Sequence, residues 1–97
     1  MRDFANKTAF ITGGASGVGL GIAKALAKAQ ANVVIADIQP ERLSDAEQQL
    51  RAITPNILAL AVDTTDIESL QRARTEIEAT VGPVSVLCNN AGIGGGG

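Results

Sequence analysis

Short apolar segments alternate along this sequence with longer segments in which apolar residues recur every three or four positions. The first kind is typical of strands buried on both faces of a sheet, and the second of amphipathic helices. We expect strands at 7–12, 32–37, 57–62 and 84–88, and helices at 18–29, 40–52 and 66–80. Strands that alternate with helices are joined by right-handed parallel crossovers, so the sequence predicts an α/β fold with a doubly wound parallel sheet.

Local signals mark where two of the expected helices begin. Pro40 suits the first turn of a helix, where a missing N–H costs nothing. Thr65 and Glu68 have the Thr-x-x-Glu spacing of a capping box, which predicts that Thr65 caps the third helix.

A glycine-rich segment, residues 12–19, joins the first expected strand to the first expected helix. Its sequence is Thr-Gly-Gly-Ala-Ser-Gly-Val-Gly. The first N–H groups of a helix have no partner within it, and its N-terminus carries about half a positive charge, so this position favours a phosphate group. Glycine is needed where the backbone takes a positive φ or where a ligand must approach closely. The segment therefore predicts a pyrophosphate-binding turn.

Small or polar residues follow all four expected strands: the segment 12–19, Asp37, the pair at 63–64 and the segment 89–92. Ligands of a doubly wound sheet bind at the carboxyl ends of its strands, so we expect these residues to line one binding edge. Asp37 can accept hydrogen bonds from an adenosine ribose, and bonds to a charged group contribute about 1.5–3 kcal/mol. The same carboxylate would repel a 2′-phosphate, and the motif offers no arginine to compensate, which favours NAD over NADP.

Each of these features also has a purely structural interpretation. Glycines after a strand often form only a tight turn, and Asp37 can be a solvated strand end. Asp63 can begin the turn before the next helix, while Asn89 and Asn90 can be turn formers. We interpret Cys88 as a small core residue, because the chain has no histidine to activate a thiol. The coincidence of four such features along one edge favours the ligand-binding interpretation.

Composition excludes other classes of function. The 97 residues allow one domain. A net charge of −2 and the lack of a Lys/Arg cluster argue against a nucleic-acid or anionic-membrane surface. No segment reaches the roughly 18 consecutive apolar residues of a membrane span, and residues 1–7 lack the layout of a secretion signal. A single cysteine cannot form an internal disulfide, so we expect a cytoplasmic protein.

The spacing of the glycines separates this turn from two better-known phosphate-binding motifs. It is neither Gly-x-Gly-x-x-Gly nor a P-loop, because no Lys-Ser/Thr follows Gly19. It reads Thr-Gly-x-x-x-Gly-x-Gly, and with Asn-Asn-Ala-Gly at 89–92 it resembles the short-chain dehydrogenase/reductase family over residues 7–92. The resemblance implies a Rossmann-like fold and an NAD(P)-dependent oxidoreductase that moves a hydride between nicotinamide and an alcohol or carbonyl substrate. It also implies that full-length relatives are homo-oligomers.

The resemblance assigns cofactor contacts to individual positions. Gly13 would allow the tight turn, Gly17 the approach of the pyrophosphate, and Gly19 the close contact of helix and strand. The carboxylate of Asp63 would meet the adenine amino group. Other implied roles are a tie between the ends of the first and fourth strands at Thr12 and a sheet-stabilising role for Asn90. The expected cofactor-binding residues are Thr12, Gly13, Ser16, Gly17, Val18, Gly19, Asp37, Ile38, Asp63, Thr64, Asn89, Ala91 and Gly92.

The family's catalytic groups have no counterpart in this sequence. The resemblance implies a Tyr-x-x-x-Lys pair, assisted by a Ser and an Asn, downstream of Asn-Asn-Ala-Gly, and the chain contains no tyrosine. We therefore expect residues 1–97 to be the incomplete, cofactor-binding part of one domain, with no catalytic or metal-binding residues and no turnover by itself. In the usual strand order, 3-2-1-4, the fourth strand would be an edge.

Two other functions remain open on the residues alone. One is a non-catalytic nucleotide-binding remnant. The other is part of an S-adenosylmethionine methyltransferase, since residues 17–21 match Gly-x-Gly-x-Gly. That family usually places an acid just before its glycines, where this chain has Thr12, and it lacks Asn-Asn-Ala-Gly.

Overall fold

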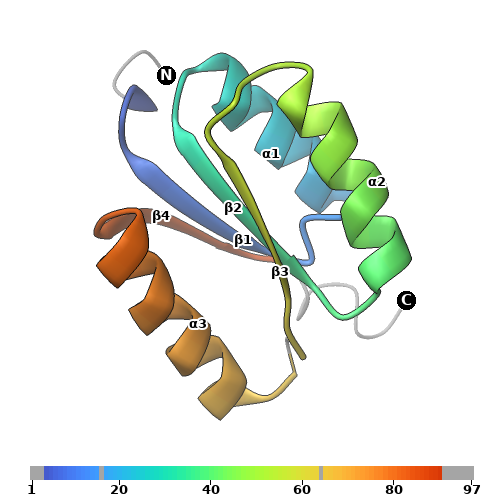
Figure 1. The fold of residues 1–97 in the computed structure, drawn as a ribbon, viewed down its shortest axis with the longest axis vertical. Coiled ribbons are helices and arrows are strands. Elements are labelled where there is room, and N and C mark those ends of the chain that lie inside the picture. The colour runs from blue at the N-terminus through green and yellow to red at the C-terminus, as the bar shows by residue number, and fades with distance from the viewer. Residues whose placement is uncertain (1–3, 16, 64, 91–97) are drawn as a thin grey trace.

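A computed structural model describes residues 4–15, 17–63 and 65–90, and it consists of a parallel sheet with helices on both sides (Figure 1). Along the chain the elements are β1 Thr8–Thr12, α1 Gly17–Lys28, β2 Asn32–Asp37, α2 Pro40–Arg51, β3 Ile57–Ala61, α3 Ile67–Thr80 and β4 Val84–Asn89. The four strands are parallel and lie in the order β3-β2-β1-β4. The predicted fold class and strand order are confirmed.

The sheet separates two apolar cores. In Figure 1, α1 and α2 lie on one side of the sheet and α3 on the other. On the α1/α2 side Ile11 and Ile35 are buried with Leu50 of α2. On the α3 side Phe10 and Val34 are buried with Ile77 of α3. Successive side chains of a strand point to opposite faces, so β1 and β2 must be apolar throughout.

The register of the strands brings their carboxyl ends level with one another. Thr12 of β1 pairs with Ala36 on one side and with Asn89 on the other, and Asp37 pairs with Ala61. The pairing of Thr12 with Asn89 extends β4 one residue beyond the predicted end of that strand.

The third helix begins differently from the prediction. Its N-cap is Asp66, whose Oδ1 accepts a hydrogen bond from the N–H of Glu68 at 3.1 Å. Thr65 is not the cap, because its hydroxyl and its N–H both donate to Oδ1 of Asp63, at 2.6 and 3.0 Å. The capping-box prediction was therefore wrong by one residue, since Thr65 belongs to the turn that follows β3.

Replacing the observed cap should weaken the third helix measurably. We expect Asp66→Ala to lower the free energy of unfolding by about 1 kcal/mol, the usual cost of losing a carboxylate cap. Urea unfolding followed by circular dichroism measures the change. Thr65→Ala is the matched control, because Thr65 is exposed and caps no helix. A larger loss for Thr65→Ala than for Asp66→Ala would restore the capping-box interpretation.

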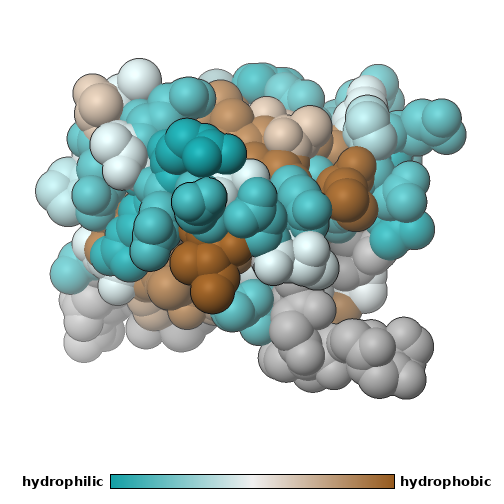
Figure 2. Space-filling view, turned by 90° about the horizontal axis from the view of Figure 1, so that it is seen from below, coloured by the Kyte–Doolittle hydropathy of each residue, from teal (hydrophilic) through white to brown (hydrophobic). Residues whose placement is uncertain are grey.

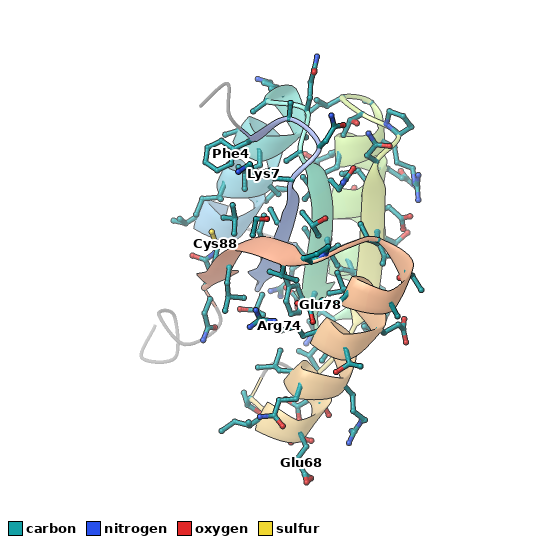
Figure 3. All side chains as sticks on the ribbon, turned by 90° about the vertical axis from the view of Figure 1, so that its left-hand side faces the viewer. Phe4, Lys7, Glu68, Arg74, Glu78 and Cys88 are labelled. Atoms are coloured by element: carbon teal, nitrogen blue, oxygen red, sulfur yellow. The ribbon has the colours of Figure 1, made fainter. Side chains whose placement is uncertain are left out.

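The buried side of α3 packs against the sheet, and the ion pair on its exposed side joins two residues of the helix itself. Arg74 and Glu78 lie side by side on this helix at 3.6 Å (Figure 3), and both are about half exposed. An exposed pair of this kind contributes about 0.3–0.5 kcal/mol. The side chain of Ile77, on the same helix, is fully buried.

None of the described helices is both long and apolar enough to cross a membrane.

The fourth strand is an edge of the described sheet, as predicted. Its residues alternate between half-buried and exposed, and Leu87 is 54% exposed. Cys88 is half-buried and packs against the core on the α1 side, where Phe4 also lies (Figure 3). This placement agrees with the structural interpretation of the cysteine.

Candidate functional site

The candidate site lies along the carboxyl edge of the sheet, which Figure 2 views from below. The strand order places Asp63 at one end of this edge, then Asp37, then the glycine turn after β1, and Asn89 at the other end. Among mostly hydrophilic atoms Figure 2 shows hydrophobic patches on this side of the molecule. Residues up to 77 positions apart in the sequence thus lie along the same edge of the sheet.

The turn after β1 depends on glycine at several positions. Gly13 and Gly17 have φ angles of 67° and 59°, a left-handed conformation that glycine adopts without steric cost. Gly19 is needed for a different reason. A Cβ at this position would overlap the carbonyl oxygen of Gly13 and lie 3.0 Å from its carbonyl carbon. The sequence predicted a close contact of helix and strand, and the structure shows the contact to be with the turn itself.

The N-terminus of α1 is open to an anion. A Cβ built at Gly17 would meet no atom of the described residues within 4 Å, so these residues leave space above the backbone there. The first turn of α1 contains no acidic residue. Val18 beside it is 72% exposed and offers an apolar surface. The unpaired N–H groups at a helix start and the helix dipole together suit a phosphate, and α1 itself adds no acidic side chain in its first turn.

Hydrogen bonds join the glycine turn directly to the end of β2. The carbonyl oxygen of Ala36 accepts from the N–H of Gly13 at 2.8 Å and from the N–H of Gly14 at 3.3 Å. Ala36 immediately precedes Asp37, so the turn and the carboxylate are held at a fixed distance from one another. A ligand bound at the turn therefore has an acidic group within the same small region.

The carboxylate of Asp37 is buried but not fully engaged. The residue is 7% exposed, and its Oδ1 accepts a hydrogen bond from the N–H of Gln39 at 3.1 Å. Its Oδ2 accepts no hydrogen bond from the described residues and is not among the buried unpaired atoms there. Ile38, the next residue, is 56% exposed. One acceptor oxygen and one apolar side chain are thus available at the end of β2.

Asp63 follows β3 on the same edge. Two hydrogen bonds to the ionised form lower the pKa of the Asp63 carboxyl below its ordinary value. The larger effect comes from the hydroxyl of Thr65 and the smaller one from its backbone N–H. The carboxylate stays charged to lower pH than a free aspartate and remains a hydrogen-bond acceptor across the neutral range.

At the other end of the edge, Thr12 joins β1 to β4. Its hydroxyl donates to Oδ1 of Asn89 at 2.8 Å, and its carbonyl oxygen accepts from the N–H of Asn90 at 3.1 Å. The tie that the resemblance implied for Thr12 is present. The Nδ2 atom of Asn90 is buried without a partner among the described residues.

The structure brings nine of the predicted site residues to this edge: Thr12, Gly13, Gly17, Val18, Gly19, Asp37, Ile38, Asp63 and Asn89. The other four, Ser16, Thr64, Ala91 and Gly92, lie outside the described residues. Sequence reasoning missed Gln39 and Thr65, whose N–H groups hold the two carboxylates. The available signal was an aspartate at a strand end, which often binds the N–H two residues later.

Comparison with known proteins decides the family. A family model described as short chain dehydrogenase matches residues 7–97. This chain belongs to the short-chain dehydrogenase family. It is similar to a C alpha-dehydrogenase from Sphingobium sp. (strain NBRC 103272 / SYK-6), with 39% identity over 94 residues, which cover 96% of this chain and 31% of the relative.

Two solved structures share the fold. The apo form of LigO from Sphingobium sp. strain SYK-6 has a TM-score of 0.84 and 43% identity, over 91% of this chain and 33% of that one. L-sorbose reductase from Gluconobacter frateurii, complexed with NADPH and L-sorbose, has a TM-score of 0.79 and 32% identity, over 87% and 32%. The chain therefore spans about a third of the length of these three proteins.

Proposed function

We propose that this short-chain dehydrogenase segment holds the adenosine diphosphate half of NAD at the carboxyl edge of its sheet. The observation that carries the proposal is the shared acceptor at Ala36, which fixes the phosphate-binding turn beside Asp37. The pyrophosphate would lie over Gly17, where no atom of the described residues obstructs it, and Oδ2 of Asp37, which has no partner among these residues, would accept from the ribose. Asp63 and Ile38 would flank the adenine.

We further propose that the nicotinamide half lies toward Asn89, together with Ala91 and Gly92 of the same motif. When bound, nicotinamide exchanges a hydride with an alcohol or carbonyl substrate, and the described residues would hold the cofactor for that exchange. The chain contains no tyrosine, the residue that the family resemblance implies as the general acid/base. We therefore expect no catalysis by the 97 residues alone, and we propose that the exchange acts on a small-molecule alcohol or carbonyl.

The preference for NAD over NADP rests on charge. L-sorbose reductase was solved with NADPH, so family membership alone does not select the cofactor. In this chain the buried carboxylate of Asp37 lies where a ribose would sit, and a 2′-phosphate would face it without the shielding of bulk water. This repulsion supports NAD.

Isothermal titration calorimetry of the 97-residue chain tests the proposal. We expect NAD to bind at least about tenfold more tightly than NADP, because the loss of one charge-assisted hydrogen bond corresponds to about that factor. S-adenosylmethionine is expected not to bind. ADP-ribose should bind as well as NAD, and nicotinamide mononucleotide much more weakly, since the glycine turn, Asp37 and Asp63 would all face the adenosine diphosphate half. Equal affinity for both halves, or binding of S-adenosylmethionine instead of NAD, would contradict the proposal.

A further inference from the structure

Both carboxylates of the candidate site are held by the backbone two residues later. Oδ1 of Asp37 accepts from the N–H of Gln39 at 3.1 Å, and Oδ1 of Asp63 accepts from the N–H of Thr65 at 3.0 Å. An aspartate that binds the N–H of the second following residue forms an Asx-turn, which fixes the side chain as well as the backbone. At the end of β2 this turn fixes the orientation of the Asp37 carboxylate.

The backbone around Asp37 is already fixed by the sheet. The carbonyl oxygen of Asp37 accepts from the N–H of Val62 at 3.1 Å, and that of Ala36 accepts from the glycine turn. The remaining freedom of the residue is rotation of its side chain. The N–H of Gln39 restricts that rotation, since it engages Oδ1 and leaves Oδ2 without a partner among the described residues.

Gln39 is itself anchored by the following helix. It is the N-cap of α2, and its carbonyl oxygen accepts from the N–H of Leu43 at 2.9 Å. Its side chain is exposed and makes no capping hydrogen bond. Leu43 in turn is buried in the core on the α1/α2 side. The contribution of Gln39 to the site is therefore its backbone N–H, held in place by the packing of α2.

We propose that Gln39 is a positioning residue whose backbone N–H fixes one oxygen of Asp37, so that the other oxygen is directed to the ribose hydroxyls of the bound nucleotide. This inference rests on the proposed function and adds a residue to it. A carboxylate that is already oriented loses less rotational freedom when the ribose binds, and this gain appears as affinity.

The test removes the N–H and compares two nucleotides that differ only in the ribose. Gln39→Pro removes the donor, and the φ of −93° at this position lies near the range of proline. Gln39→Ala keeps the N–H and is the matched control. The probes are ADP and 2′,3′-dideoxy-ADP, with affinities measured by calorimetry and the fold of each variant checked by circular dichroism. A purely structural change would alter the affinity for both probes alike.

We expect the wild-type chain to prefer ADP over the dideoxy analogue at least about tenfold, as a hydrogen bond to a charged group implies. Gln39→Pro should reduce this preference about fivefold, the effect of one ordinary hydrogen bond, and Gln39→Ala should not change it. An unchanged preference in Gln39→Pro would overturn the positioning role while leaving the proposed function intact. A wild-type chain that binds ADP but does not distinguish the two probes would contradict the proposed role of Asp37 itself.

A second variant keeps the test decisive if Gln39→Pro does not fold. Chemical ligation can join residues 38 and 39 through an ester, which replaces the N–H by oxygen and preserves the shape of the backbone. The same fivefold loss of preference is expected, and retention of the full preference would again overturn the inference.

Discussion

Gly19→Ala is expected to destabilise the fold by about 3 kcal/mol, the upper end of the range for an overpacked site. The added methyl group would overlap the carbonyl oxygen of Gly13 and lie 3.1 Å from the Cα of Gly14. Both neighbours are backbone atoms of a turn whose N–H groups are bound to Ala36. The turn must therefore open to admit the methyl group, and the phosphate-binding geometry should be lost together with stability.

Gly21→Ala is the matched control for this substitution. Gly21 lies two residues further along the same helix, and a Cβ there would meet no atom within 4 Å in the part of the chain that the structure describes. Alanine in an exposed helical position is more favourable than glycine by about 1 kcal/mol, so this variant should be slightly more stable than the wild type. Urea unfolding of both variants measures the difference, and NAD titration reports on the turn. A Gly19→Ala variant as stable as Gly21→Ala would show that the turn relaxes at little cost.

The predicted elements agree with the observed ones to within one residue at each boundary, because the apolar pattern and the local breakers point to nearly the same positions. The strand Asn32–Asp37 was predicted with its observed bounds, since it is buried on both faces and ends at an acid. The fourth strand was predicted one residue too short. Asn89 is polar and reads as a loop residue, yet the hydroxyl of Thr12 holds it in the ladder. A hydrogen bond between residues 77 positions apart leaves no local trace in the sequence around Asn89.

The site was predicted less completely than the fold. Spacing identified the strand-end acids and the glycines, because each of these residue types has a recognisable reason to occupy its position. It did not reveal what holds the acids, because the donors at Gln39 and Thr65 are backbone N–H groups, which every residue except proline carries. The capping error has the same origin. Thr65 and Asp66 are both good N-caps, and only the hydrogen bonds to Asp63 show which of them is free to cap α3.

Asp37→Asn is expected to abolish the proposed preference for NAD over NADP. The amide oxygen can still accept from the N–H of Gln39, so the turn is retained while the negative charge is lost. Affinity for NAD should fall about tenfold or more, as the loss of a charge-assisted hydrogen bond of about 1.5–3 kcal/mol requires. Affinity for NADP should fall less or rise, because the 2′-phosphate no longer meets a carboxylate.

Calorimetric titration of both cofactors measures the ratio directly, and Asp45→Asn controls for the change in net charge. Asp45 lies on the exposed face of α2, where its carboxylate accepts only from Gln49 among the described residues. A uniform electrostatic effect would change the ratio of NAD and NADP affinities equally in the two variants, whereas a local effect would change it only in Asp37→Asn. If Asp37→Asn kept the wild-type ratio of affinities, the carboxylate would not lie at the ribose, and the adenosine end of the site would have to be placed elsewhere along the edge. A ratio that collapses only in Asp37→Asn would place the ribose at the end of β2, because among the described residues that position alone combines a buried acid, an oxygen without a partner and the adjoining turn.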